Sequence, residues 1–215
     1  MNRDLTNYRK SYEKSFLEEN NLPDSPFVLF SEWFKEVENA GGVEEANAMT
    51  LTTVGLDGFP KNRVVLLKGV DEDGFVFYTN YTSEKGKAIS ENNKVCLSFF
   101  WPNLERQVIV KGTAKKVSEE KSVAYFQSRP RGSQLGAWAS NQSKVIISRE
   151  MLETRIASLE KQYKNTEIPK PSFWGGYCVE PYSFEFWQGR PNRLHDRIRF
   201  LVLENEKWQI SRLAP

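Results

Sequence analysis

Apolar positions recur with a helical period near the start of the chain and with a strand-like pattern after it. A helix is predicted from Ser25, which suits the N-cap ahead of Pro26 in the first turn, to Gly41-Gly42. Asp57-Gly58 and residues 71–74 supply turns between the strand-like runs, so consecutive strands are expected to form an antiparallel meander. The predicted strands cover 48–54, 62–68, 75–79, 94–101 and 106–117.

The second half of the chain mixes helices with further strands. The predicted helices cover 83–92, 118–128, 132–140 and 148–164, with Ser83 and Ser118 as N-caps. A long sheet segment over 174–187 and a hairpin over 198–204 and 208–213 follow. The fold class is therefore mainly antiparallel β with peripheral helices, an α+β arrangement that suits a closed or split β-barrel. Residues 25–215 are expected to form one domain, and the polar segment 1–24 is either a frayed arm or a mobile lid.

A cationic stretch near the C-terminal end is the strongest chemical signal. Residues 193–199 alternate with period two, so a strand would place Arg193, His195, Arg197 and Arg199 on one face. His195 is the only histidine in 215 residues. The guanidiniums would repel one another unless an anion neutralises them, although a solvated edge strand is the plain alternative. Apolar and aromatic residues flank the stretch, so we interpret it as part of a pocket for a planar, phosphorylated ligand.

Composition excludes several classes of function. The net charge of +2 is too small to indicate a nucleic-acid partner by itself. Cys96 and Cys178 lack metal-ligand spacing and sit in apolar runs, which favours reduced thiols in the core of a cytoplasmic protein. The first residues lack the apolar core of a signal peptide, and no apolar run has the length of a membrane span. We therefore expect a cytoplasmic protein with no metal, no nucleic acid and no membrane as a partner.

Further candidate ligand groups lie in strands and near helix ends. Arg63 and Lys68 flank one predicted strand and face opposite sides unless a bulge re-aims one of them. Ser83 and Lys85 open a helix, where backbone N–H groups can hold an anion. Each group alone is also compatible with a plain cap or a surface charge. Other polar candidates are Gln107, Tyr125, Arg129, Ser133, Gln142 and Ser143. There is no dinucleotide fingerprint, P-loop or catalytic triad order, so the chemistry is expected to come from a bound cofactor.

Motifs along nearly the whole chain, from about Arg9 to Pro215, resemble the pyridoxine/pyridoxamine 5'-phosphate oxidase family. They are RVVLLK (63–68), FYTN (77–80), LERQV (104–108), YFQSRPR (125–131), GAW (136–138), PSFWGG (171–176), FWQG (186–189), RLHDR (193–197) and RLAP (212–215). The resemblance implies an FMN-binding split β-barrel, assembled as a homodimer with the flavin at the subunit interface. It also implies oxidation of pyridoxine or pyridoxamine 5'-phosphate to pyridoxal 5'-phosphate. In that reaction a hydride passes to flavin N5 and O2 is reduced to hydrogen peroxide.

The resemblance also implies roles for individual residues. Arg193 and His195 would be catalytic, lying with Leu194 against the substrate ring. Arg9 and Tyr12 would belong to the lid over the substrate. The substrate phosphate would be gripped by Lys68, Tyr125, Arg129 and Ser133. FMN would be held by Arg63, Val64, Val65, Leu66, Leu67, Lys68, Tyr78, Thr79, Ser83, Lys85, Gln107, Gln142, Ser143, Trp187 and Arg197.

Glu84 departs from the family pattern, which commonly has arginine beside the flavin phosphate. A carboxylate cannot donate to phosphate, so affinity for FMN is expected to rest more on Arg63, Lys85 and backbone N–H groups.

Other functions stay open at this point. The chain could be a related split-barrel flavoprotein with another substrate, or a non-catalytic carrier of flavin or pyridoxal phosphate. Nucleic-acid binding is the function that the small net charge supports least. Within the oxidase interpretation, His195 either orients the substrate or moves a proton, and the sequence leaves both roles open.

Overall fold

The computed structural model describes residues 3–215 and divides into two compact units, each assembled from several segments. The first unit comprises the chain up to Met49 together with Leu97–Lys111 and Tyr182–Pro215. The second unit comprises Thr50–Cys96 and Gly112–Pro181. Four strands, β1, β5, β6 and β7, contribute residues to both units, so the single domain expected over residues 25–215 stays a prediction.

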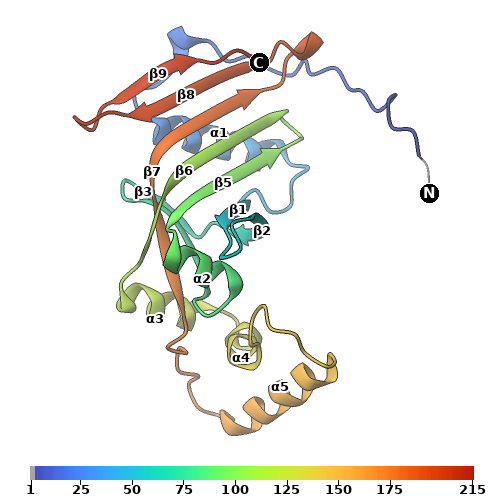
Figure 1. The fold of residues 1–215 in the computed structure, drawn as a ribbon, viewed down its shortest axis with the longest axis vertical. Helices are drawn as coiled ribbons and strands as arrows, with labels where there is room; N and C mark the ends of the chain where they lie inside the picture. The colour runs from blue at the N-terminus through green and yellow to red at the C-terminus, as the bar shows by residue number, and fades with distance from the viewer. Residues whose placement is uncertain (1–2) are drawn as a thin grey trace. The chain divides into compact units, whose positions relative to one another are not determined.

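The strands join in the hydrogen-bonded order β2-β1-β5-β6-β7-β4-β3, and β7 also pairs with β8, which pairs with β9 (Figure 1). They are β1 (Ala48–Val54), β2 (Pro60–Leu66), β3 (Gly69–Asp71), β4 (Gly74–Asn80), β5 (Lys94–Trp101), β6 (Arg106–Lys116), β7 (Trp174–Gln188), β8 (Asp196–Val202) and β9 (Trp208–Arg212). The pairs β3–β4, β4–β7, β7–β8 and β8–β9 are antiparallel. The predicted fold class, mainly antiparallel β with peripheral helices, is confirmed.

Two of the helices begin at serine caps that the sequence predicts. Ser83 Oγ accepts from the Gly86 N–H and Ser118 Oγ from the Lys121 N–H, which confirms both predicted N-caps. The side chain of Ser25 makes no such bond, and Pro26 alone marks the start of its helix. The helices are α1 (Pro26–Ala40), α2 (Glu84–Glu91), α3 (Glu119–Ser128), α4 (Arg131–Ala139) and α5 (Glu150–Gln162), with short 3-10 turns η1 (Glu19–Asn21) and η2 (Pro191–Arg193). Among residues 3–215, none of the helices is long and apolar enough to cross a membrane.

Each unit has its own aromatic core. In the first unit, α1 places Phe30 at 5.1 Å from Phe99 and Trp33 at 5.2 Å from Phe186, measured between ring centroids. In the second unit, Phe126 and Trp174 pack with their ring centroids 5.2 Å apart. That contact belongs to a buried cluster with Leu135 and Ile168. Burial of these large side chains is the main stabilising contribution to both units.

Two differences between the predicted and the observed strands concern candidate site residues. The strand expected from Arg193 begins only at Asp196, because Asn192 and Arg193 have φ of 56° and 63°, which is left-handed backbone. Arg193 and His195 therefore do not share a strand face with Arg197. The strand expected to reach Lys68 ends at Leu66, since the Lys68 N–H already donates to Val76 O and leads into β3.

Both thiols are less buried than the sequence indicated. Cys96 and Cys178 are half-buried, not deep in the core. Burial, followed by the nearby carboxylates of Asp71 and Asp73, raises the pKa of Cys178 to about 11. The Cys178 thiol is therefore protonated and weakly nucleophilic at neutral pH.

Gly74 holds the tight turn between β3 and β4 with φ of 133°, and a Cβ placed there would overlap the carbonyl oxygen of Val179. We expect Gly74→Ala to lower the free energy of unfolding by about 2–4 kcal/mol, through backbone strain and overpacking. Urea denaturation followed by tryptophan fluorescence measures the change. Gly132→Ala is the matched control, because a Cβ on Gly132 meets nothing within 4 Å. Equal midpoints for the two variants would contradict this account.

Candidate functional site

A cavity of about 470 Å³ lies in the second unit and is lined by residues from β2, β4, α2, α3, α4, the first residue of β7 and the loops beside them. It is lined by Val64, Val65, Leu66, Lys68, Tyr78, Thr79, Asn80, Lys85, Tyr125, Arg129, Ser133, Gly136, Ala137, Ser140, Gln142 and Trp174. The set predicted for the substrate phosphate, Lys68, Tyr125, Arg129 and Ser133, is brought together in full. Asn80, Gly136, Ala137, Ser140 and Trp174 were not predicted, although most of them fall within the quoted motifs.

An aromatic stack and an arginine form one wall of this cavity. Tyr78 stacks on Tyr125 with ring centroids 3.9 Å apart and on Trp174 at 5.5 Å. The guanidinium carbon of Arg129 lies 4.7 Å from the Trp174 ring centroid. Arg129 Nη1 is buried without a hydrogen-bond partner, and burial lowers the pKa of this guanidinium. Because a buried, unpaired cationic donor is costly, the wall suits an anionic ligand.

A second group of donors in the cavity centres on Gln142. Lys85 Nζ donates to Gln142 Oε1 over 3.1 Å, and Thr79 Oγ1 donates to the same oxygen over 3.3 Å. Lys85 is buried in the first turn of α2, after the cap residue Ser83. Burial and then the charge of Arg63 lower the pKa of the Lys85 ammonium. A desolvated cation at the start of a helix favours a bound anion.

Arg63 and Glu84 lie beside this donor group but outside the lining of the cavity. Arg63 Nη1 donates to Thr53 Oγ1 over 2.7 Å and to the Lys61 carbonyl over 2.8 Å. Glu84 forms an ion pair with Lys61, which offsets its negative charge next to the predicted phosphate site. Ser143 lines a neighbouring cavity of about 370 Å³ that Gln142, Glu84 and Lys61 also line. The departure from the family pattern at Glu84 is thus accompanied by a lysine counter-charge.

The remaining predicted residues of the second unit do not reach the cavity. Leu67 is 7% exposed and belongs to the core. Ser83 is fully buried, and its hydroxyl also donates to Asn80 O over 2.6 Å.

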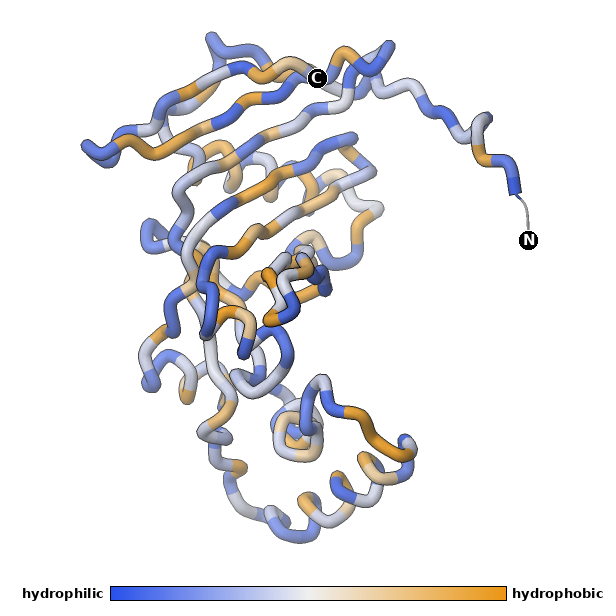
Figure 2. Tube along the Cα trace, viewed as in Figure 1, coloured by the Kyte–Doolittle hydropathy of each residue, from blue (hydrophilic) through white to orange (hydrophobic). Residues whose placement is uncertain are grey.

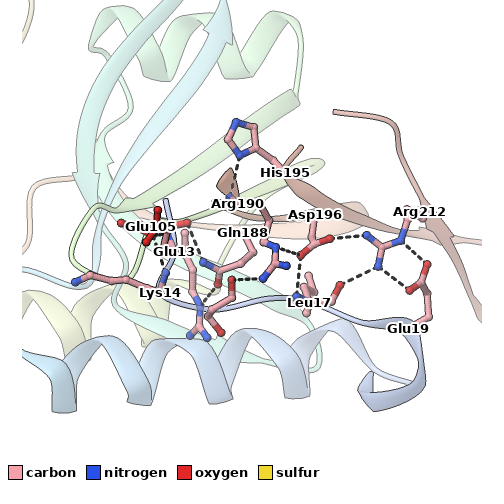
Figure 3. Close-up of polar contacts among 12 residues, drawn as sticks. Glu13, Lys14, Leu17, Glu19, Glu105, Gln188, Arg190, His195, Asp196 and Arg212 are labelled. Atoms are coloured by element: carbon pink, nitrogen blue, oxygen red, sulfur yellow. Dashed lines mark hydrogen bonds and ion pairs between the residues drawn. The ribbon is translucent and has the colours of Figure 1, made fainter. Parts of the chain in front are cut away.

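His195 lies in the first unit, packed against two aromatic rings. Its ring centroid is 4.7 Å from that of Trp187 and 5.9 Å from that of Tyr12, a residue of the N-terminal arm. Its Nδ1 accepts the backbone N–H of Arg190 over 3.1 Å, as Figure 3 shows. Burial and then Arg193 lower the pKa of His195, while Asp196 acts to raise it. The imidazole is therefore biased toward its neutral form.

The other predicted residues of the first unit differ in exposure. Arg197 is held by Glu185 Oε1 and the Ala214 carbonyl, each over 2.8 Å, and the bond to Glu185 raises its pKa. Gln107 is half-buried on β6. Arg193, Leu194 and Arg9 are exposed. Among residues 3–215, no cluster of three or more histidine, cysteine or acidic side chains is arranged to hold a metal ion.

Comparisons with known proteins give a consistent result. A family model described as pyridoxamine 5'-phosphate oxidase matches residues 36–163. A second, described as pyridoxine 5'-phosphate oxidase C-terminal dimerisation region, matches residues 174–215. A pyridoxine/pyridoxamine 5'-phosphate oxidase of Flavobacterium psychrophilum is 60% identical over 99% of this chain and 100% of its own length. That of Flavobacterium johnsoniae is 61% identical over 98% of this chain and 99% of its own.

Solved structures agree on the fold. The crystal structure of PhzG from Burkholderia lata, in complex with tetrahydrophenazine-1-carboxylic acid, has a TM-score of 0.88 and 29% sequence identity. The likeness covers 96% of this chain and 100% of that one. A pyridoxamine 5'-phosphate oxidase-related, FMN binding protein from Nostoc punctiforme has a TM-score of 0.70 at 16% identity, covering 90% of this chain and 100% of that one.

Proposed function

Because this chain belongs to the pyridoxine/pyridoxamine 5'-phosphate oxidase family, we propose that it oxidises pyridoxine and pyridoxamine 5'-phosphates to pyridoxal 5'-phosphate with FMN as cofactor. The observation that carries the proposal is the cavity in which Lys68, Tyr125, Arg129 and Ser133 meet. A phosphate bound there would supply the missing acceptor for Arg129 Nη1. The hydroxyls of Tyr125 and Ser133 would fix its position.

The donor group around Gln142 fits the cofactor. Lys85 and Thr79 offer a desolvated cation and a hydroxyl to the anionic end of FMN, while Val64, Val65 and Leu66 line the same cavity from β2. When bound, FMN would supply the redox chemistry, which is acceptance of a hydride equivalent from the substrate and transfer of two electrons to O2 to give hydrogen peroxide; with the amine substrate, water then replaces the nitrogen, which leaves as ammonia. The chain's own part is to bind and orient both ligands, because hydride transfer depends on close approach.

We assign the residues of the first unit to the ring of the substrate. Arg193 is exposed and can reach a ligand, whereas His195 is fixed against Trp187. Trp187 and Arg197 are proposed to contact FMN. Arg9 and Tyr12 are proposed to contact the substrate as part of a lid, for which the packing of Tyr12 beside His195 is the support.

The enzyme is a homodimer, since residues 174–215 match the family's C-terminal dimerisation region. We propose that FMN lies at the subunit interface. The loop between α4 and α5, part of which is coloured hydrophobic in Figure 2, exposes Val145 and Ile147 at 101% and 93%, and apolar surface of this kind favours a protein partner. A cytoplasmic location stays a prediction drawn from the thiols.

Purified protein is expected to carry FMN and to release hydrogen peroxide and pyridoxal 5'-phosphate when pyridoxamine 5'-phosphate or pyridoxine 5'-phosphate is added in air. Visible absorbance measures the flavin, and a coupled peroxidase assay measures the peroxide. Tetrahydrophenazine-1-carboxylic acid serves as the comparison substrate. Bound FMN without peroxide from either phosphate would favour a carrier. Turnover of the tricyclic compound alone would assign the chain to another substrate.

A further inference from the structure

Arg190 connects the N-terminal arm to His195 within the first unit (Figure 3). Its backbone N–H donates to His195 Nδ1 over 3.1 Å. Its guanidinium Nη1 donates to the Ser15 carbonyl of the arm over 3.1 Å, and its Nε lies 3.5 Å from Asp196 Oδ2. One residue thus touches the imidazole through its backbone and the arm through its side chain.

The bond to Nδ1 selects one form of the imidazole. A ring nitrogen that accepts an N–H must carry a lone pair, so the proton of the neutral ring is on Nε2. The imidazolium has no acceptor nitrogen and cannot keep this bond. We propose that Arg190 is a positioning residue that holds His195 as the neutral Nε2–H tautomer, and that the N-terminal arm fixes Arg190 in place. On the basis of the proposed function, His195 then orients the substrate as a hydrogen-bond donor from Nε2.

The charged groups around His195 support this assignment. On its own segment, Arg193 disfavours the imidazolium and Asp196 favours it. Arg190 adds a further cation beside Asp196, with which it pairs. From β7 and the arm, the packed neighbours are the uncharged rings of Trp187 and Tyr12, with Lys10 Nζ 5.9 Å from the Tyr12 ring. The lowering of the His195 pKa by burial and by the cation is larger than the rise caused by the single carboxylate of Asp196.

The arm is held on both sides of Ser15, which makes its carbonyl a fixed partner for Arg190. Ahead of Ser15, the buried Glu105 carboxylate accepts the N–H groups of Glu13 and Lys14 over 2.9 and 3.1 Å. After it, Asp196 Oδ2 accepts the Leu17 N–H over 3.1 Å. The arm also packs closely on Gly189, the residue after β7. A Cβ built on Gly189 would lie only 2.8 Å from Tyr12 Cβ.

Since His195 is the only histidine, nuclear magnetic resonance of untagged, uniformly ¹⁵N-labelled protein reports on it without overlap. In the resting wild-type protein we expect an unprotonated Nδ1, a protonated Nε2 and a slowly exchanging amide at residue 190. In Arg190→Lys, which keeps the charge but loses the fork to Ser15 and Asp196, that amide should exchange at least about 10-fold faster. The pKa of His195 should rise toward its ordinary value, and kcat/KM should fall about 10-fold.

Glu105→Gln tests the arm separately, because Glu105 contacts the arm and not His195. It should shift the His195 signals in the same direction as Arg190→Lys does. It should also speed the exchange of the residue-190 amide. Arg149→Ala, at the exposed N-cap position of α5, should change neither readout. A protonated Nδ1 in the wild type, or unchanged His195 signals in both variants while circular dichroism shows them folded, would overturn the proposal. These readouts need no substrate, so they stand apart from failure of the proposed oxidase activity.

Discussion

Arg129→Ala is expected to raise the KM for pyridoxamine 5'-phosphate about 100-fold, with a much smaller change in kcat and with FMN still bound. Arg129 presents a buried Nη1 that has no partner within the protein, so its donors are available to the substrate phosphate. A phosphate held equally in the ground state and the transition state contributes to KM and not to kcat. Steady-state kinetics and flavin absorbance measure the two effects.

Unphosphorylated pyridoxamine sharpens this test. The variant should lose most of the wild type's preference for the phosphorylated compound, because only that compound can use Arg129. Arg129→Lys should recover part of the preference, since it restores charge without the planar fork. Arg149→Ala, which removes an arginine that is 88% exposed, should leave KM unchanged. An unaltered preference in Arg129→Ala would show that the phosphate binds elsewhere.

Local signals were sufficient to predict most elements of the fold. Ser83 and Ser118 cap their helices as expected because a side-chain cap depends on residues only three positions apart. Gly41 ends α1 with φ of 64°, a conformation that glycine adopts at little cost. The alternation from Asp196 onward also holds, with Ile198 and Phe200 fully buried.

The alternation fails at Arg193 and His195 because backbone conformation takes precedence there. Pro191 opens a 3-10 turn, and the left-handed Asn192 and Arg193 interrupt any extended strand. An arginine pattern gives no warning of this, since Arg has no special preference for left-handed backbone. The face shared by four basic residues is therefore reduced to Arg197 and Arg199 on β8.

The phosphate-binding group of the candidate site was predictable from the family resemblance, but the place of every residue was not. The resemblance already grouped Lys68 with Arg129, and both line the cavity, whereas only the fold shows that Leu67 is in the core. Arg190 and Glu105 were missed for another reason. Arg190 acts through its own backbone N–H, and the Glu105 carboxylate accepts backbone N–H groups of the arm. Contacts of backbone groups leave no pattern of side-chain types in the sequence.

Alanine at Arg193 or at His195 is expected to lower kcat about 100-fold while FMN stays bound. Arg193 is exposed, so its loss removes no packing, and any loss of turnover reflects a missing contact with the ligand. His195 packs on Trp187, so fluorescence titration of FMN must accompany the His195→Ala kinetics. A His195→Ala variant with normal FMN affinity and slow turnover fits a contact with substrate.

Anaerobic mixing with pyridoxamine 5'-phosphate isolates the step at which both residues are proposed to act. Bleaching of the flavin then reports substrate oxidation alone, without the reaction with O2. Each variant should bleach about 100-fold more slowly than the wild type, whereas reoxidation of chemically reduced flavin should keep its rate. Wild-type bleaching rates in both variants would remove Arg193 and His195 from the chemistry. Slow reoxidation with normal bleaching would instead place the two residues in the reaction with O2.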